Sequence, residues 1–471
     1  MAKLSIAPEA ASILGRLARP NEEVSAHWPG GRPGRQPIHT VYGGAQLFRH
    51  DIAHRLGVAA LAALDEHGKD PFAFARAIGL TGSSRLPERA KALKGRIDPA
   101  ALKAEAFEPW LALEVHRRVR DKLTTEPVED FRIDFEDGFG HRPDEEEDAV
   151  ALVAADQLAR GLAEGTLPPF IGIRVKPLNE ELKRRSARTL DLFVTHACEK
   201  AQGKLPPWFA VTLPKITAPA QVSALAHLLA QLERKLGLKD GAIQIELMIE
   251  QTPSLFDAEG RFMLPALAAA ANGRCAGAHF GTYDYTASVD VTAAHQTMGH
   301  PACQLALSLM QVAFAGTRVA LSDGATNVLP VPIHRVPKKK KQIAENTAAI
   351  HAAWALSYRN IRASLANGLY QGWDLHPAQI PVRYAATYAF FLEGFDEAAA
   401  RLQNFVSRAA QAVLAGGVFD DAATGQGLLN FFLRARQSGA IGDDELGVTG
   451  LTADEIQTRS FSKILEGRTR R

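Results

Sequence analysis

The sequence is poor in several features that identify common classes of protein. It has only three cysteines, Cys198, Cys275 and Cys303, too few and too scattered for a disulfide framework or a cysteine-based zinc site. Lys and Arg number 54 against 52 for Asp and Glu. The net charge of +2 therefore gives no excess of positive charge that would attract a nucleic acid or a membrane surface. We therefore expect a small-molecule substrate and a reducing, cytoplasmic location.

Long hydrophobic runs and common nucleotide-binding or nucleophile motifs are also missing. No stretch is apolar enough to span a bilayer, and the first 20 residues lack a signal-peptide pattern, so we expect a protein that is not exported. There is no Walker loop, nucleophile elbow or aromatic–basic stripe. With 471 residues, 46% of them hydrophobic, the chain can form one large domain with appendages, or two to three domains.

Short β-like runs alternate with longer amphipathic stretches along most of the chain. Eight such βα units favour an α/β fold of the closed (β/α)₈ TIM-barrel type over an open doubly wound sheet, which would carry a glycine-rich turn after its first strand. The predicted strands lie at 39–43, 131–137, 170–177, 209–215, 243–250, 276–285, 318–324 and 368–377.

Three regions fall outside the predicted barrel, which itself spans 37–390. Residues 1–36 are rich in Pro and Gly and have the character of an N-terminal arm. Residues 50–125, after the first strand, are predicted to form a helical insertion. Residues 391–471 follow the eighth strand, and we expect a helical appendage that serves as a lid or an oligomer arm.

Two acidic residues stand where neighbouring predicted strands end. In IQIELMIE at 243–250, alternation puts the isoleucines and the leucine on one side and leaves Glu250 as the last inward residue. Asp284 follows the next strand, at the rim where barrel active sites lie. Mg²⁺ takes one or two carboxylates and fills its octahedron with water and substrate oxygens, so this pair is a candidate metal site. From spacing alone, helix capping or ion pairing explains each acid equally well.

An arginine and two further acids are predicted at the same rim. Alternation in GIRVKP points Arg174 inward, and Glu136 and Asp137 end the strand FRIDFED. An inward arginine needs an anionic partner, which is either a substrate oxygen or, as a purely structural ion pair, Glu136 or Glu246. Asp323 in LSDGATN either faces this site or forms an Asx turn with Gly324.

The motifs RIDFEDG, GIRVKP, TLPKI, LMIEQT, HFGTYDY and LHPAQI occur in an order that resembles the HpcH/HpaI aldolase and citrate lyase β-subunit superfamily, which includes malyl-CoA lyases and malate synthases. The resemblance spans roughly residues 39–385. It implies that Glu250 and Asp284 bind Mg²⁺ or Mn²⁺, that Arg174 contacts substrate oxygens, and that the backbone at Gly281, Thr282 and Tyr283 receives a substrate carboxylate.

The resemblance is incomplete in ways that bear on the substrate. TYDY is closer to malate synthases, LHPAQI is closer to the lyases, and the insertion at 50–125 belongs to neither pattern. Members use a lid acid, often lent by a neighbouring subunit; no residue here matches it cleanly, and Asp421, or its neighbour Asp420, is our candidate. A homo-oligomer is expected on this basis.

These observations lead to the hypothesis of a metal-dependent carbon–carbon lyase acting through the enolate of a 2-oxo acid or acyl thioester. The substrate would be a 2-oxo acid, a hydroxy acid or an acyl-CoA. The alternatives are a malate synthase-like condensing enzyme, a phosphoryl-transfer enzyme that uses the basic run at 338–341, and a non-catalytic regulator. Lys176 and Lys215 also leave an imine mechanism open.

Overall fold

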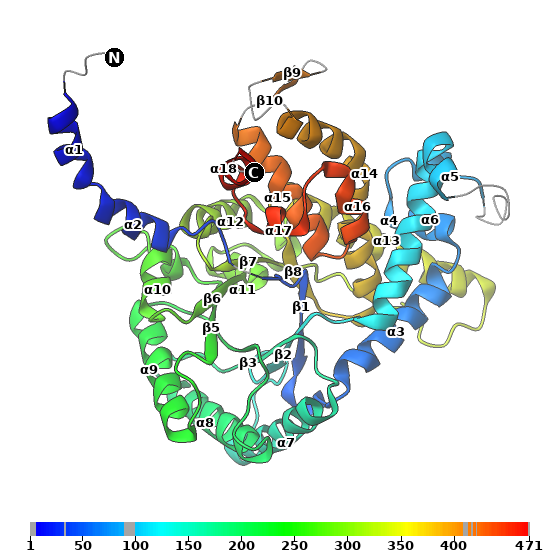
Figure 1. Cartoon of the computed structure of the whole chain (residues 1–471). Coiled ribbons are helices and arrows are strands. Elements are labelled where there is room, and N and C mark those ends of the chain that lie inside the picture. Colours follow the sequence, from blue (N-terminus) through cyan, green and yellow to red (C-terminus); the bar gives the residue numbers. More distant parts are fainter. Residues whose placement is uncertain are drawn as a thin grey trace.

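Eight parallel strands close into a barrel, each pairing with the next and the last with the first (Figure 1). The computed structural model of the 471-residue chain describes residues 6–32, 34–88, 99–407, 413–415, 418–420 and 422–469. The strands are β1 (His39–Gly44), β2 (Asp130–Asp134), β3 (Phe170–Arg174), β4 (Phe209–Leu213), β5 (Ile243–Ile249), β6 (Cys275–Phe280), β7 (Ala320–Ala325) and β8 (Gln371–Asp374). The predicted (β/α)₈ barrel is confirmed.

Helices connect the strands and cover the outside of the barrel (Figure 1). They are α7 (Asp144–Glu164), α8 (Lys183–Lys200), α9 (Pro219–Leu236), α10 (Leu264–Ala270), α11 (Thr282–Ser288), α12 (Pro301–Phe314), α13 (Lys340–Ala366) and α14 (Ile380–Ser407). Short 3-10 turns lie at Ala45–Leu47, Ser83–Arg85, Thr252–Ser254, Ala293–His295, Pro377–Gln379 and Gly447–Thr449. No helix in the described ranges combines the length and apolar character needed to cross a membrane.

The connection between β1 and β2 is almost wholly helical. It holds α3 (Ile52–His67), α4 (Pro71–Ile78), α5 (Pro99–Glu105) and α6 (Phe107–Thr125). Asp70 caps α4, because its carboxylate accepts from the amides of Phe72 at 3.0 Å and Ala73 at 3.1 Å. This helical segment packs beside α13 and α14 rather than over the strand ends.

The barrel interior is polar at its middle level, which is unusual for a core usually filled by branched apolar residues. Arg132 is fully buried and binds both oxygens of Glu246 through the Nε and Nη2 side of its guanidinium, with Nε 2.8 Å from Oε2. Thr212 also donates to Glu246 at 2.9 Å. Burial alone would raise the pKa of Glu246, but Arg132 outweighs it and lowers the pKa to about 2. This ion pair therefore fills the space beneath the rim.

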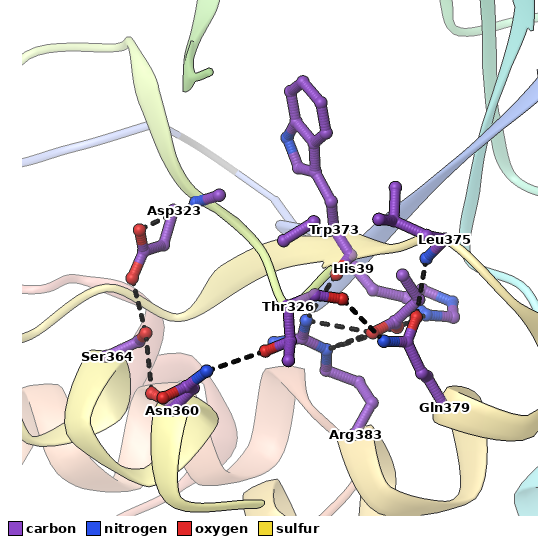
Figure 2. Close-up of polar contacts among 12 residues, drawn as sticks. His39, Asp323, Thr326, Asn360, Ser364, Trp373, Leu375, Gln379 and Arg383 are labelled. Carbon is purple, nitrogen blue, oxygen red and sulfur yellow. Dashed lines mark hydrogen bonds and ion pairs between the residues drawn. The ribbon is translucent and has the colours of Figure 1, made fainter. Parts of the chain in front are cut away.

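A second polar network lies on the outer side of the barrel, between strands β7 and β8 and the helices that follow them. Figure 2 shows Gln379, Thr326, Asn360, Ser364 and Asp323 joined in a continuous series of contacts. Asp323 accepts from the amide of Gly324 at 2.7 Å and from the Ser364 hydroxyl of α13. Asp323 therefore binds α13 instead of facing the acidic rim, and its bond to the amide of the next residue is not the predicted Asx turn, in which the amide two residues on is bound.

The C-terminal segments pack on α14 and reach the N-terminal ends of the strands. They comprise β9 (Val413–Ala415), β10 (Val418–Asp420), α15 (Ala422–Gln437), α16 (Asp443–Leu446), α17 (Ala453–Gln457) and α18 (Phe461–Thr469). Rings of α15 meet rings of α14, with centroids 5.2 Å apart for Phe391 and Phe431. Arg434 of α15 donates to Gln36, which precedes β1, at 2.6 Å. Lid and oligomer roles for this segment stay predictions.

The N-terminal segment contains two helices that project from the barrel (Figure 1). They are α1 (Ala7–Gly15) and α2 (Ala18–His27), and no residue of α2 is buried. The extended chain that follows crosses the N-terminal ends of the strands, where the amides of Gly30 and Gly31 donate to the carbonyl of Gly316, each at 3.0 Å.

Candidate active site

Acidic and basic side chains gather at the C-terminal rim, from the ends of β2 to β6. Glu250 is the residue after β5 and is 1% exposed, and Asp284 lies in the first turn of α11, just after β6. Glu136 and Asp137 follow β2, and Arg174 ends β3. All five were predicted to lie at this rim, and the structure brings them together, because the carboxyl ends of parallel strands share one end of a barrel.

Glu250 is held by its neighbours' backbone. Its Oε1 accepts from the amide of Lys215 at 2.7 Å. A Cβ at Gly281 would stand 2.3 Å from Oε2, so only glycine at position 281 leaves room for this carboxylate. Burial raises the pKa of Glu250 to about 8; the charge of Lys215 and, less strongly, that of Arg174 act to lower it, and the charge of Asp284 acts to raise it, so burial prevails. The positive charges near this carboxylate therefore do not offset the effect of its burial.

The ammonium group of Lys215 is directed into the acidic cluster. Its Nζ lies 2.5 Å from Glu136, 3.4 Å from Asp284 and 3.5 Å from Asp137. The backbone at Lys215 adopts φ of +50°, in the left-handed region that is uncommon for residues other than glycine. Burial would lower its pKa, but Glu250 and Glu136 outweigh burial and raise it, so the amine stays charged. A charged amine is a poor imine-forming nucleophile.

Arg174 is anchored by one side of its guanidinium. Nε and Nη2 donate to the two oxygens of Asp134 at 2.7 and 2.5 Å, whereas Nη1 lies 3.1 Å from Glu136 and 3.3 Å from Asp137. Of the two structural partners predicted, Glu136 is therefore correct and Glu246 is wrong, because Glu246 is bound to Arg132. Asp134 is the partner that sequence reasoning missed.

The register of β2 against β3 explains why the pair of Asp134 and Arg174 was not predicted. Asp134 and Arg174 are Cα partners in the β2–β3 ladder, so their inward side chains lie side by side. The alternation in FRIDFED predicts that Asp134 points inward, and this was the signal that the sequence contained. The register of β2 against β3 cannot be obtained from the sequence. Asp134 also accepts from the amides of Glu136 at 2.9 Å and Gly138 at 2.7 Å, which turns the chain at the end of β2.

Glu136 is a second carboxyl group with a raised pKa. Burial raises the pKa to about 7, against the lowering effect of Arg174, and the negative charge of Asp137 adds to the rise. Asp137 is more exposed, and its own pKa is lowered, because the hydrogen bond from Glu136 and the charge of Arg174 outweigh burial. Near neutral pH, Glu136 can therefore both release and accept a proton.

The predicted carboxylate-binding backbone opens helix α11. Gly281 donates its amide to Ile249 at 3.0 Å, so that amide is occupied, while the first-turn amides of Thr282 and Tyr283 have no acceptor within the helix. The Tyr283 side chain points away, since its hydroxyl donates to Ala325 at 2.7 Å and accepts from Asn327 at 2.9 Å. Only the backbone of Tyr283 is available for a ligand.

Lys176, which was left open as an imine-forming residue, is not part of this cluster. Lys176 is buried, and its Nζ lies 2.7 Å from the carbonyl of Phe135 and 2.9 Å from Glu147 of α7, on the outer side of the barrel. Asp421 lies outside the described residues. Asp420 belongs to β10, and the structure describes nothing of its side chain.

The cluster suits a metal that needs few protein ligands. In the part of the chain that the structure describes, no group of three or more His, Cys, Asp or Glu residues forms a metal cage. Two carboxylates suffice for Mg²⁺, which completes its octahedron with water and substrate oxygens. Glu250, whose pKa is raised by burial, and the neighbouring Asp284 together provide such a pair of hard oxygen donors.

Comparison with known proteins identifies a family. A family model described as "Domain of unknown function (DUF6986)" matches residues 17–464. The chain belongs to this family. No curated protein matches the DUF6986 chain.

Comparison with solved structures gives matches of low sequence identity to this DUF6986 chain. A citrate lyase from Burkholderia xenovorans LB400 is 17% identical over 70% of this chain and 91% of its own, with a TM-score of 0.50. Malate synthase from Haloferax volcanii is 14% identical over 89% and 98%, with a TM-score of 0.41, and its lead(II) complex is 14% identical over 78% and 95%, with a TM-score of 0.38. At 17% identity, the likeness to the citrate lyase extends to the fold alone.

Proposed function

We propose that this protein is a Mg²⁺- or Mn²⁺-dependent carbon–carbon lyase that forms or consumes the enolate of a 2-oxo acid or acyl thioester. The observation that carries the proposal is the convergence of Glu250, Asp284 and Arg174 on one rim of the barrel, with charged Lys215 among the acids. The motif order that resembles the citrate lyase superfamily supports it, and the structural likeness to a citrate lyase supports its fold.

Glu250 and Asp284 would hold the metal. When bound, a divalent cation supplies Lewis-acid stabilisation of the substrate's keto or thioester oxygen. Glu250 is suited to this because its burial disfavours a lone negative charge, and a nearby cation would offset that cost. Asp284 is only half-buried, which leaves one side of the pair open to water and substrate.

Arg174 would contact the oxygen on which negative charge develops. Its Nη1 is the freer side of the guanidinium, at 3.1 and 3.3 Å from Glu136 and Asp137, whereas Asp134 fixes the other side. Fixed donors directed at developing charge stabilise a transition state without reorganisation. The amides of Thr282 and Tyr283 would bind the substrate carboxylate, and Glu136 and Asp137 would order substrate or water beside Arg174.

A proton must be exchanged at the carbon next to the carbonyl. Glu136 has a pKa of about 7, close to neutral pH, and lies beside Arg174 and Lys215. Asp421 is the alternative acid, assigned by resemblance to the lid residue of the superfamily. A malate synthase-like condensation would use the same groups in the reverse direction, forming the bond that a lyase breaks.

The test combines a substrate panel with removal of the metal. Purified protein is assayed with 2-oxo acids, hydroxy acids, aldehydes and acyl-CoA esters, with EDTA and after readdition of Mg²⁺ or Mn²⁺. We expect activity that EDTA removes and metal restores, and that Glu250→Gln and Asp284→Asn both lack. Glu66→Gln is the matched control, because Glu66 is an exposed acid at the end of α3 whose only ion pair shown is 3.7 Å to His67.

A trapping experiment separates metal from imine chemistry. Borohydride added with substrate should trap nothing, because the acids keep Lys215 charged and Lys176 points to α7. A substrate adduct on either lysine, with activity that survives EDTA, would refute the proposed mechanism.

A further inference from the structure

A cavity of about 340 Å³ lies at the end of the barrel opposite the acidic cluster. Its walls come from Gly30, Gly31, Arg32, Gly34 and Gln36, from the loops that precede β7 and β8, and from α15 and the turn after α17. This volume falls in the range of sites for small ligands. The cavity therefore joins three parts of the chain that are far apart in sequence.

Three arginines line this cavity, and no lining residue is acidic. They are Arg32, Arg434 and Arg459. Arg434 donates to the neutral side chain of Gln36 at 2.6 Å and stands 4.8 Å from the ring centroid of Tyr370. Within the described ranges the structure shows no ion pair for Arg32, Arg434 or Arg459. Arg35 and Arg436 nearby, by contrast, pair with Glu126 and Asp443.

The guanidinium groups are fixed in position without neutralisation. Arg32 lies over Trp208, 3.8 Å from the ring centroid. Arg459 donates to the carbonyl of Gly34 at 3.4 Å, and its Nη1 would stand 2.6 Å from a Cβ at Gly31. Gly31 has φ of +111°, so both its conformation and its lack of a side chain admit Arg459. These contacts position the charges and leave their charge unbalanced.

Electrostatics show the cost of this arrangement. Burial lowers the pKa of Arg434 to about 10, and repulsion from Arg459 acts in the same direction. Burial also lowers the pKa of Arg459 and of Arg32. Arg32 is partly balanced by Glu246 and Asp130 in the barrel, but Arg132 opposes them. Buried charges of one sign are unfavourable unless a counter-charge joins them, and guanidinium forks match the oxygens of phosphate and carboxylate groups.

We propose that this cavity is a second binding site, for a small organic oxyanion that carries at least two negative charges, such as a phosphate ester or a dicarboxylate. Arg434 and Arg459 bind the anion, and Arg32, from the N-terminal segment, contributes a third positive charge to the wall of the site. Because the walls include α15 and the N-terminal ends of the strands, the bound anion fastens the C-terminal helices to the barrel. The site lies apart from the rim chemistry and does not depend on it.

Thermal unfolding and calorimetry on the full chain test this site, with pyrophosphate, inorganic phosphate and malonate as probes. Sodium chloride at equal ionic strength is the reference. We expect the unfolding midpoint to rise with at least one oxyanion and not with chloride, because a ligand that binds only the folded state stabilises it. Binding of phosphates alone, of malonate alone or of both identifies the anion class, and each supports the site.

Matched variants locate the binding. Arg434→Gln should weaken oxyanion binding on the order of tenfold or more, because a charge-assisted bond is lost, yet should leave the unliganded protein as stable as before or more so. Arg459→Gln provides the same test independently if the first variant fails to fold. Arg436→Gln, on the same helix but paired with Asp443, should bind as the wild type does. Equal stabilisation by chloride, no binding of any probe, or wild-type affinity in both variants would overturn the proposal.

Discussion

Glu250 shows how single residues determine the chemistry available at the rim. A carboxylate at the end of a barrel strand was predictable from alternation, and Asp284 from the following strand end. What the sequence could not show is the close fit around Glu250, where the amide of Lys215 binds one oxygen and the absent side chain of Gly281 leaves space for the other.

Gly281→Ala should lower the affinity for Mn²⁺ by at least an order of magnitude while the fold is retained. Its backbone at φ of −91° accepts alanine, but the new Cβ would lie 2.3 Å from Glu250 Oε2 and must displace it. Calorimetry with Mn²⁺ measures the effect. Gly277→Ala on β6, the strand that leads to Gly281, is the control, because the nearest neighbour of the new Cβ is at an ordinary 3.4 Å; equal affinity in both variants would contradict the role of Glu250.

Arg174→Lys should retain metal binding but lose about 10²-fold in turnover, as expected when a fixed donor to developing charge is removed. Arg274→Lys is a matched control: Arg274 is a buried arginine that binds both oxygens of Glu233, each at 2.7 Å, away from the rim. Turnover with the substrate found in the panel is the measurement. Equal losses in the two variants would make Arg174 a structural residue only.

At the same scale, the direction in which a side chain points just after a strand ends was the hardest feature to predict. Lys215 and Lys176 both follow strands, yet Lys215, with φ of +50°, lies among the acids while Lys176 reaches Glu147 outside. Arg174 was correctly directed inward, but its main partner, Asp134, depends on strand register, which a single sequence does not contain.

At the scale of elements, the positions of all eight strands follow from hydrophobic alternation, whereas several of their ends do not. The second strand was predicted to reach residue 137 but ends at Asp134, because that carboxylate binds two following amides and turns the chain. The sixth was predicted to reach residue 285 but ends at Phe280, since α11 begins at Thr282. The residues that break the strands are those that form the candidate site.

The ion pairs between β1, β8 and α14 should make stability depend on acid pH. Asp374 lies 2.7 Å from His39 Nδ1 and 3.0 Å from Arg383 (His39 and Arg383 are labelled in Figure 2). Because Glu129 donates its amide to His39 Nε2, Nδ1 carries the proton that faces Asp374. Burial would raise the pKa of Asp374, but Arg383 and His39 outweigh burial and lower it from 3.8 to about 2.

A lowered folded-state pKa means that the unfolded chain binds the proton first. The contribution of Asp374, roughly 2 kcal/mol, should be complete above about pH 4 and be lost as the pH falls through about 2. Asp374→Asn should therefore reduce the free energy of unfolding more at pH 6 than at pH 3. Urea denaturation at both values measures this, and a difference that does not shrink with acid would contradict the assignment.

At the scale of the whole molecule, the two termini differ in how they meet the barrel. The C-terminal helices share the apolar core with α14, whereas α1 and α2 stand away from it (Figure 1). Ile13, Leu14, Leu17 and Val24 are each between 46% and 61% exposed. An apolar face of this kind on a projecting arm favours contact with a second copy of the chain.

Removing residues 1–24 should change the unfolding midpoint by no more than about 2 °C, because α2 buries nothing against the barrel. The mass measured by light scattering should fall to that of a smaller assembly. An unchanged mass would argue against an oligomer arm, and a large drop in the midpoint would show that the arm packs on its own barrel.

Solvent hydrogen exchange most directly tests the central claim of metal-assisted enolate formation, because it needs only one substrate of a pair. Pyruvate, other 2-oxo acids and acetyl-CoA are incubated with the protein in D₂O, and NMR follows deuterium entry next to the carbonyl. We expect exchange that requires Mg²⁺ or Mn²⁺, stops with EDTA, and is absent in Glu250→Gln. Exchange that persists with EDTA and in Glu250→Gln, or no exchange across the panel in protein shown to bind the metal, would contradict it.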